Sequence, residues 1–285
     1  MKIAKNITDV RQLVQSWKAQ RLRVAFVPTM GNLHAGHLSL VGKAREIADK
    51  VVVSIYVNPM QFGAGEDFDT YPRTFDADSE KLIEAGADLL FLPSTDLMYA
   101  DSVKASTQVY VPELTEILCG ESRPGHFLGV STIVNKLFNV VQPDVAIFGQ
   151  KDFQQVIIIR RMVADLLMPV KIIALPTSRE PDGLAMSSRN QYLGADERKV
   201  APKISKLMNE MSDLVSNGAD ITDTEAKGVE ALASAGFKPE YFSFRDPDTL
   251  AALEQAQTDM VLLVAAKLGS TRLIDNCLFS LRTAV

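Results

Sequence analysis

The alternation of short apolar runs with helical patterns along the first 175 residues constrains the fold most. Apolar runs rich in β-branched residues predict strands at residues 24–27, 51–57, 88–92, 145–148 and 171–175. Apolar residues at three- and four-residue spacing predict helices over residues 9–20, 38–48, 74–85, 131–141 and 153–166. This order is typical of right-handed βαβ units. We therefore expect an α/β fold with a Rossmann-like parallel sheet.

The pattern changes after residue 175. A polar loop with glycine and proline covers residues 176–193, and a long helical pattern follows from about residue 196 to 215. Further strand-like runs lie at residues 241–245, 260–266 and 272–276. We expect a nucleotide-binding domain at 1–175 and a smaller α+β C-terminal domain at 176–285 that closes over the site, with the loop as hinge and site edge.

Composition excludes several classes of protein. A net charge of −5 argues against a nucleic-acid surface, which usually shows as a basic face. Cys119 and Cys277 lie far apart without metal-site spacing, so we expect free thiols in a reducing cytosol. The amino terminus lacks the apolar core of a signal peptide, and no apolar run approaches the ~18 residues of a membrane span. We expect a cytoplasmic protein without membrane or nucleic-acid partners.

A phosphate site is predicted where the strand at residues 24–27 gives way to a helix. The sequence there is Pro28-Thr29-Met30-Gly31-Asn32-Leu33-His34-Ala35-Gly36-His37. A helix start offers unpaired amides and the positive end of the helix dipole, which favour an anion. His34 and His37 would share one face of the first turn, and Gly36 allows close approach of a ligand. The chain has three histidines, and two of them lie in this turn.

Polar residues follow two more predicted strands, at 58–61 and 149–152, and would open on the same edge of the sheet. Lys151 could reach a phosphate there, while Asp152 would cap the next helix. A lone lysine beside an N-cap is more typical of a solvated surface. The shared sheet edge with the histidines favours the phosphate interpretation.

Further polar segments suit a nucleotide and a small acid. Met186-Ser187-Ser188-Arg189 carries two hydroxyls and a guanidinium, a set that could wrap a triphosphate, although alone it is more typical of a solvated turn. Gln61 and Gln155 are neutral amides that can recognise hydroxyls and a carboxylate without adding charge. The long, acidic loop at residues 62–73 is typical of a lid.

Two common nucleotide motifs are excluded. Gly120 and Gly125 have the spacing of a P-loop, but His126 and Phe127 stand where lysine and serine or threonine are required. The run at residues 63–65 lacks the third glycine of a dinucleotide fingerprint and does not open a helix after a strand. Nucleotide binding by either motif is therefore not expected.

Several motifs carry a resemblance to a known family. They are Pro28-Thr29-Met30-Gly31 with His34-Ala35-Gly36-His37, Asn58-Pro59-Met60-Gln61-Phe62, Arg123-Pro124-Gly125-His126-Phe127, Gly149-Gln150-Lys151-Asp152-Phe153-Gln154-Gln155, and Asp182-Gly183-Leu184-Ala185-Met186-Ser187-Ser188-Arg189-Asn190. In this order, over nearly the whole chain, they resemble the pantoate–β-alanine ligase family of the His-x-Gly-His nucleotidyltransferase superfamily. The resemblance implies ATP-dependent condensation of (R)-pantoate with β-alanine through a pantoyl adenylate, giving pantothenate, AMP and diphosphate. It places the reaction in pantothenate and coenzyme A biosynthesis, and implies Mg²⁺ with ATP and a homodimer.

The same resemblance assigns site residues. Catalysis is assigned to His34, His37 and Lys151. ATP binding is assigned to Met30, Gly31, Asn32, Leu33, His34, Ala35, Gly36, His37, Gly149, Gln150, Lys151, Asp152, Ser178, Met186, Ser187, Ser188 and Arg189. Pantoate binding is assigned to Gln61 and Gln155, β-alanine binding to Gln61, and secondary positions to Asn58, Tyr71 and Arg123. The sequence shows no dedicated metal cage, so we expect phosphate and water to hold most of the Mg²⁺, with Asp78 as the protein candidate.

Two departures from the family pattern are minor. Gln150 stands where glutamate is also common, and Ser178, whose backbone the resemblance places at adenine, stands where an aliphatic residue is more usual. Another nucleotidyltransferase on the same fold, which would keep the nucleotide in its product, and a non-catalytic nucleotide sensor remain as alternatives. A tRNA synthetase fits less well because the chain is short and acidic. Formation of AMP would separate these alternatives.

Overall fold

The computed structural model describes residues 1–100, 102–103 and 105–281. The chain forms two compact units. The first comprises Met1–Gly149 with Gln155–Leu175, and the second comprises Gln150–Gln154 with the chain from Pro176 onward. Nucleotide binding by the first domain and closure of the C-terminal domain over the site stay predictions.

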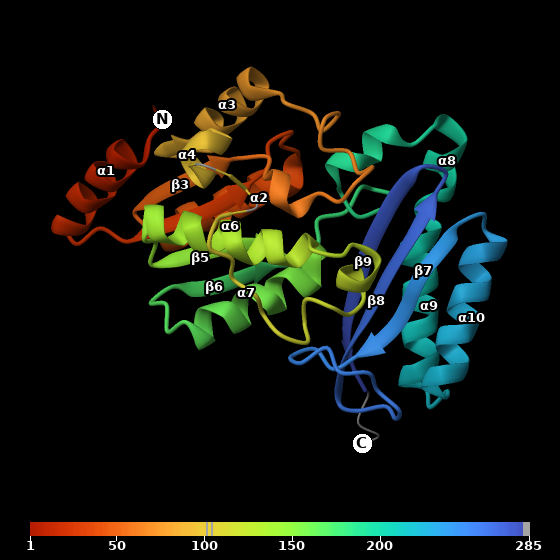
Figure 1. The fold of residues 1–285 in the computed structure, drawn as a ribbon. Coiled ribbons are helices and arrows are strands. Elements are labelled where there is room, and N and C mark those ends of the chain that lie inside the picture. Colours follow the sequence, from red (N-terminus) through yellow and green to blue (C-terminus); the bar gives the residue numbers. More distant parts are fainter. Residues whose placement is uncertain (101, 104, 282–285) are drawn as a thin grey trace. The chain divides into compact units, whose positions relative to one another are not determined.

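A parallel sheet of six strands forms the centre of the first unit (Figure 1). The strands are β1 (Lys2–Ala4), β2 (Val24–Thr29), β3 (Lys50–Ile55), β4 (Leu89–Phe91), β5 (Val145–Gly149) and β6 (Lys171–Leu175). Their spatial order is β1-β4-β3-β2-β5-β6, so the chain reverses direction across the sheet between β2 and β5. Ligands of such sheets bind beyond the carboxyl ends of the strands at this reversal. The α/β fold and the five predicted strands are confirmed. The edge strand β1 was missed because it has only three residues.

Helices cover both faces of this sheet. The first unit contains α1 (Ile7–Ala19), α2 (Ala35–Ile47), α3 (Phe75–Glu84), α4 (Thr95–Tyr99), α5 (Cys119–Ser122), α6 (His126–Val141) and α7 (Phe153–Asp165). On one face Val27 packs with residues of α2 and α3 such as Leu40 and Leu82. On the other face Phe26 meets Phe138 of α6, with ring centroids 6.3 Å apart. Because neighbouring strand residues point to opposite faces, a strand buried on both sides reads as a continuous apolar run.

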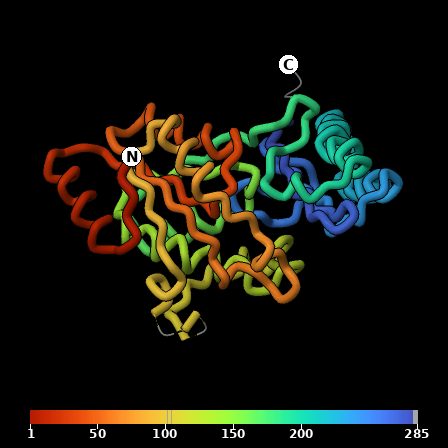
Figure 2. The backbone as a smooth tube through the Cα atoms, turned by 90° about the horizontal axis from the view of Figure 1, so that it is seen from above, coloured from red at the N-terminus to blue at the C-terminus, as the bar shows by residue number. Residues whose placement is uncertain are grey.

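The second unit has an antiparallel sheet of three strands, β7 (Lys238–Arg245), β8 (Asp259–Leu268) and β9 (Thr271–Ser280), in the order β7-β8-β9. Its helices are α8 (Ala195–Val200), α9 (Lys203–Ser216) and α10 (Ile221–Ser234). Helices α9 and α10 contact each other and the sheet, and Figures 1 and 2 show them side by side. Met208, Leu232 and Phe242 belong to the core between them. The strands predicted here are confirmed, and they are longer than predicted.

One predicted helix of the second unit is corrected. The single helical pattern at 196–215 is two helices, since α8 ends before Pro202 and α9 begins after it. Proline lacks the amide proton that a helix interior needs. Both cysteines are free thiols, as expected. Among the described residues, no helix combines the length and apolar character needed to cross a membrane.

Candidate active site

The turn after β2 depends on two residues with left-handed backbone. Gly31 has φ of +85° and Asn32 has φ of +50°. A Cβ on Gly31 would lie 3.2 Å from a carboxylate oxygen of Asp78, so both conformation and space favour glycine. The Thr29 hydroxyl accepts the Gly31 amide at 3.2 Å and donates to the Ser54 carbonyl at 2.8 Å. These contacts hold the turn in one conformation.

Asp78 in the first turn of α3 anchors the same turn. Its buried carboxylate accepts the backbone amides of Asn32 and Leu33, each at 2.8 Å. The Thr74 hydroxyl donates to it at 3.0 Å, and Lys81 of α3 donates to the Leu33 carbonyl at 2.7 Å. These contacts give Asp78 a structural role in the turn, and its expected role as a Mg²⁺ ligand stays a prediction. Its oxygens are buried and already accept three hydrogen bonds.

His34 and His37 cap the amino end of α2. The His34 Nδ1 atom accepts the Gly36 amide at 3.2 Å, and the His37 Nδ1 atom accepts the His34 amide at 3.4 Å. The pair forms a capping box, with imidazoles in place of the usual hydroxyl and carboxylate. The helix begins at Ala35 rather than at the predicted residue 38 because His34 supplies this cap.

The capping bonds fix the tautomers of both histidines. An Nδ1 atom that accepts a hydrogen bond carries no proton, so each neutral ring holds its proton on Nε2. The centroids of the His34 and His37 rings lie 4.1 Å apart. The start of α2 therefore carries two neighbouring Nε2–H donors, a group suited to phosphate oxygens.

Gln61 lies in a short 3₁₀ helix, η1 (Pro59–Gln61), which follows β3 and is capped by Asn58. The Asn58 Nδ2 atom donates to Gln61 Oε1 at 3.2 Å and to the Gly129 carbonyl at 3.1 Å. The Gln61 Nε2 atom approaches the Met30 sulfur at 3.0 Å. The predicted pantoate residue thus lies against the predicted nucleotide turn. These contacts fix which end of the Gln61 amide is the oxygen.

Tyr99 and α6 support this arrangement. The Tyr99 hydroxyl donates to Asn58 Oδ1 at 2.7 Å. Burial raises the pKa of Tyr99, which keeps its hydroxyl protonated as a donor. A Cβ on Gly129 would lie 2.5 Å from the Met60 carbonyl oxygen and 2.6 Å from the Gln61 nitrogen. Only glycine lets α6 pack this closely on η1.

Arg123 and His126 hold the backbone of Gln61. The Arg123 Nη1 atom lies 3.0 Å from His126 Nε2. Because a guanidinium only donates, this ring keeps its proton on Nδ1 and donates it to the Gln61 carbonyl at 2.8 Å. Arg123 also pairs with both carboxylate oxygens of Glu66, at 2.7 and 2.5 Å. Burial alone would raise the pKa of Glu66, but the hydrogen bond and charge of Arg123 lower it overall.

The loop between η1 and α3 has its own packing. The Phe62 ring meets Phe68 and the buried Tyr71 edge-on, with centroids 5.3 and 5.9 Å away. Arg73 donates to the backbone carbonyls of Phe68 and Tyr71, each at 3.1 Å. The loop is therefore a compact segment, fastened by Glu66. Its expected role as a lid stays a prediction.

In the second unit, Lys151 lies in the 3₁₀ turn η2 (Gln150–Asp152). The Asn276 Nδ2 atom of β9 donates to the carbonyls of Gln150 and Lys151, each at 2.9 Å. The cap predicted for Asp152 stays a prediction. Gln155, in the first turn of α7, belongs to the first unit and is partly exposed.

The loop expected at residues 176–193 contains a hairpin. The Ser178 carbonyl accepts the Met186 amide at 2.9 Å, and Arg179 forms an antiparallel bridge with Ala185. Gly183 turns the chain with φ of +91°. A carbonyl oxygen can accept two hydrogen bonds, so this contact leaves room for another, and the expected adenine contact at Ser178 stays a prediction.

A further 3₁₀ helix, η3 (Ser188–Tyr192), follows the hairpin. The Ser187 hydroxyl caps it by accepting the Arg189 amide at 3.2 Å. A hydroxyl that accepts in this way keeps its proton for donation to another group. The predicted triphosphate segment is therefore an ordered helix start rather than an irregular turn.

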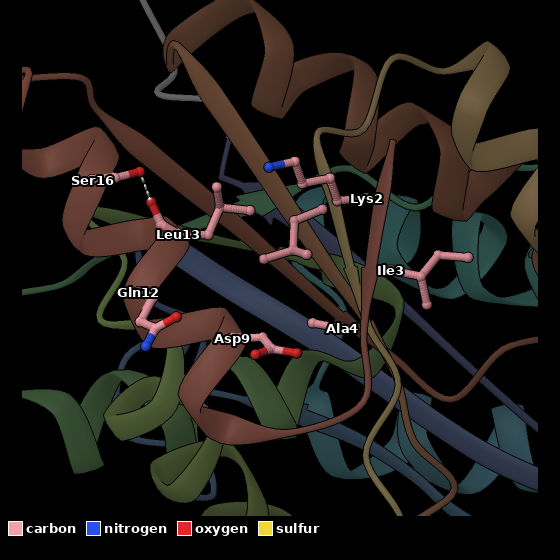
Figure 3. Close-up of a pocket in the computed structure, with 8 residues that line it drawn as sticks. Lys2, Ile3, Ala4, Asp9, Gln12, Leu13 and Ser16 are labelled. Atoms are coloured by element: carbon pink, nitrogen blue, oxygen red, sulfur yellow. Dashed lines mark hydrogen bonds between the residues drawn. The ribbon is translucent and has the colours of Figure 1, made fainter.

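A hollow in the first unit lies elsewhere, between β1, β4 and α1 (Figure 3). Its lining residues are Lys2, Ile3, Ala4, Asp9, Gln12, Leu13, Ser16 and Leu89. The Ser16 hydroxyl there donates to the Leu13 carbonyl at 2.7 Å. None of these residues belongs to the predicted site, so this hollow has no part in it.

Comparison with known proteins identifies the family. Residues 2–278 match the family described as pantoate-beta-alanine ligase. The chain belongs to the pantoate–β-alanine ligase family. It is 53% identical to pantothenate synthetase from Stutzerimonas stutzeri over the full length of both chains. It is 52% identical to that of Shewanella pealeana, covering 97% of this chain and 98% of the other.

Solved structures of this family share the fold. Pantothenate synthetase from Thermus thermophilus superposes with a TM-score of 0.91 at 42% identity, covering 97% of this chain and 99% of that one. The Francisella tularensis pantoate–β-alanine ligase, solved in complex with β-γ ATP and β-alanine, gives a TM-score of 0.83 at 35% identity, covering 98% and 97%. The chain is therefore a ligase of pantothenate synthesis.

Within this ligase, sequence reasoning missed most of the residues that support the site. Asp78 was considered only as a metal ligand, and Tyr99, Glu66 and Asn276 were not considered. The neighbouring polar residues Asp275 and Asn276 interrupt an apolar strand, which was a usable signal for a special role. Nothing in the local sequence connects Tyr99 to Asn58, because 41 positions separate them.

Proposed function

We propose that this ligase joins (R)-pantoate to β-alanine in two steps. First, a carboxylate oxygen of pantoate attacks the α-phosphorus of ATP. An oxygen–phosphorus bond forms, the bond from that phosphorus to diphosphate breaks, and pantoyl adenylate results. Second, the neutral amine of β-alanine attacks the acyl carbon. A carbon–nitrogen bond forms, AMP leaves, and the amine gives up a proton, which yields pantothenate.

The pair of Nε2–H donors on His34 and His37 carries this proposal. In-line displacement at the α-phosphorus spreads negative charge over the phosphate oxygens, and preorganised donors stabilise that charge without a covalent enzyme intermediate. Both rings are fixed by capping bonds to the backbone, so they need little reorganisation during the reaction. We assign them to charge stabilisation and to assistance of the leaving group.

The remaining roles follow from charge and hydrogen-bonding capacity. Lys151 and Arg189 supply positive charge for the phosphates, with the hydroxyls of Ser187 and Ser188 as further donors. Gln61 and Gln155 bind pantoate, and Gln61 also contacts β-alanine. The Francisella tularensis complex with β-γ ATP and β-alanine supports ATP and β-alanine as substrates.

Magnesium enters this scheme with ATP as part of the substrate. In the parts of the chain that the structure describes, no three or more His, Cys, Asp or Glu side chains gather into a metal site. Phosphate oxygens and water are the usual ligands of Mg²⁺ bound in this way. We further propose that the protein forms a homodimer, which the family resemblance supports. We also propose that it lies in the cytoplasm, which the free cysteines support.

Product analysis with Mg·ATP tests the proposal. Pantoate alone should give a burst of diphosphate equal to the enzyme concentration, and sustained AMP formation should need β-alanine as well. ATP labelled at the α-phosphorus should put all label into AMP. Label in a product that holds the nucleotide covalently attached to the acceptor, rather than in free AMP, would favour another nucleotidyltransferase. ATP binding without any turnover would favour a nucleotide sensor.

A further inference from the structure

Two neighbouring buried polar residues on β9 stand out in the second unit. Asp275 and Asn276 have exposed fractions of 2% and 3% in a strand that is otherwise largely apolar. Their strand neighbours on β8 are the apolar residues Val264 and Leu263. Burying a carboxylate and an amide is unfavourable unless both find partners. The partners of these two side chains are therefore informative.

The Asn276 side chain holds the turn that carries Lys151. Its Nδ2 atom donates to the carbonyls of Gln150 and Lys151, each at 2.9 Å, so both amide protons are used. The Gln150 Nε2 atom lies 3.4 Å from Asn276 Oδ1 on the other side of the amide. These contacts bind a turn between β5 and α7 to a strand more than a hundred residues later.

Asp275 holds the hairpin that leads into the Met186–Arg189 segment. It forms a bidentate pair with Arg179, at 2.7 and 3.0 Å, and its side chain has no exposed surface. Arg179 also donates to the Gly183 carbonyl at 3.0 Å. Hydrogen bonding to Asp275 raises the pKa of Arg179, so the guanidinium stays charged.

We propose that Asp275 and Asn276 are positioning residues that join the Lys151 turn and the segment with Ser187, Ser188 and Arg189 into one rigid piece. This inference rests on the proposed function, in which both segments bind the phosphates of ATP. The two cations would then be placed by one strand, β9, and would act as a set. Neither Asp275 nor Asn276 needs to touch the substrate for this role.

A double-mutant cycle between Asn276 and Lys151 tests the proposal. Asn276→Asp keeps the shape and the oxygen that faces Gln150, but loses both protons given to the turn. In the otherwise unchanged enzyme it should lower kcat for AMP formation by about 10- to 100-fold, the scale expected when a catalytic group is misplaced. The KM for pantoate should stay within about twofold, since Gln61 belongs to the first unit. In a Lys151→Ala background the same change should cost less than about twofold in kcat.

Controls separate positioning from general stability. Thr271→Val changes another buried polar residue of β9, whose hydroxyl makes no hydrogen bond with the described residues, and it should leave kcat within about twofold. Asn276→Ser, which can donate only one proton, provides a second variant if Asn276→Asp does not fold. Equal losses of kcat in both backgrounds, or normal kcat in folded Asn276→Asp, would overturn the inference. Absence of AMP formation by the unmodified enzyme would instead contradict the proposed function.

Discussion

At the scale of single residues, the two ends of the His37 ring have separate tasks. Its Nδ1 atom accepts the His34 amide at 3.4 Å, and its Nε2–H is the proposed phosphate donor. Asparagine at this position keeps an acceptor close to Nδ1 and loses the distal donor. Glutamine at this position places an amide N–H close to where the Nε2–H of His37 lies. We predict that His37→Asn slows adenylate formation about 10²- to 10³-fold, the cost of one preorganised donor, and that His37→Gln loses less.

Rapid-quench measurement of the diphosphate burst distinguishes the two variants. Equal losses in His37→Asn and His37→Gln would show that the distal donor is not what matters at this residue. A normal burst in both would remove His37 from the chemistry altogether.

The close packing at Gly129 gives a second prediction for a single residue. A methyl group there would meet backbone atoms of Met60 and Gln61 at 2.5 and 2.6 Å and would displace η1. Gly129→Ala should raise the KM for pantoate at least tenfold with little change in ATP binding. Gly42→Ala in α2 meets nothing within 4 Å and should stabilise the protein by about 0.5–1 kcal/mol. Steady-state kinetics and thermal unfolding of both variants check this contrast, and an unchanged pantoate KM in Gly129→Ala would contradict it.

At the scale of elements, α3 acts as a clamp on the nucleotide turn. Its Asp78 accepts two amides of the turn and its Lys81 donates to the Leu33 carbonyl. Asp78→Asn removes the charge and faces one of the two amides with an NH₂ group. We predict a loss of about 2–4 kcal/mol in unfolding free energy, because a buried donor remains without its acceptor. Denaturant unfolding, with and without Mg·ATP, measures it. Full stability in Asp78→Asn would show that the carboxylate is not the anchor.

The sequence predicted elements better than the contacts between them. Strands β2 to β6 follow from apolar runs, and the phosphate turn follows from the histidines and glycines that stand next to each other. The clamp on Leu33 could not be predicted, since an acid in the first turn of a helix already has a local explanation as a complement to the helix dipole. Likewise, His34 as a helix cap lies outside the usual set of capping residues, so the start of α2 was placed too late.

The loop after η1 yields a pH-dependent prediction for an element. The pKa of Glu66 is lowered in the folded protein, so its pair with Arg123 holds the loop above the ordinary pKa of 4.5 and is lost as pH falls through the lowered value. Glu66→Gln should speed amide exchange in residues 62–74 about tenfold at pH 7 and remove the acid dependence. Asp69→Asn, an exposed charge in the same loop, is the matched control. Identical exchange in Glu66→Gln and the unmodified protein would show that other contacts hold the loop.

At the scale of the whole molecule, the two units have separate cores and can be followed by separate probes. The single tryptophan, Trp17, lies in α1 of the first unit. In the second unit, a Cβ on Gly228 of α10 would meet the Phe242 ring at 2.5 Å, an overpacking that costs about 1–3 kcal/mol. Far-ultraviolet circular dichroism reports the unfolding of both units, whereas Trp17 fluorescence reports the first. If each core unfolds by itself, Gly228→Ala should lower the midpoint of the circular dichroism phase that has no counterpart in fluorescence, and leave the midpoint of Trp17 fluorescence unchanged. Gly42→Ala should instead raise the fluorescence midpoint and the circular dichroism phase that accompanies it, and leave the other phase unchanged. Parallel shifts of both probes in both variants would mean that the units unfold as one, so that destabilising α10 would also weaken the turn that carries His34 and His37.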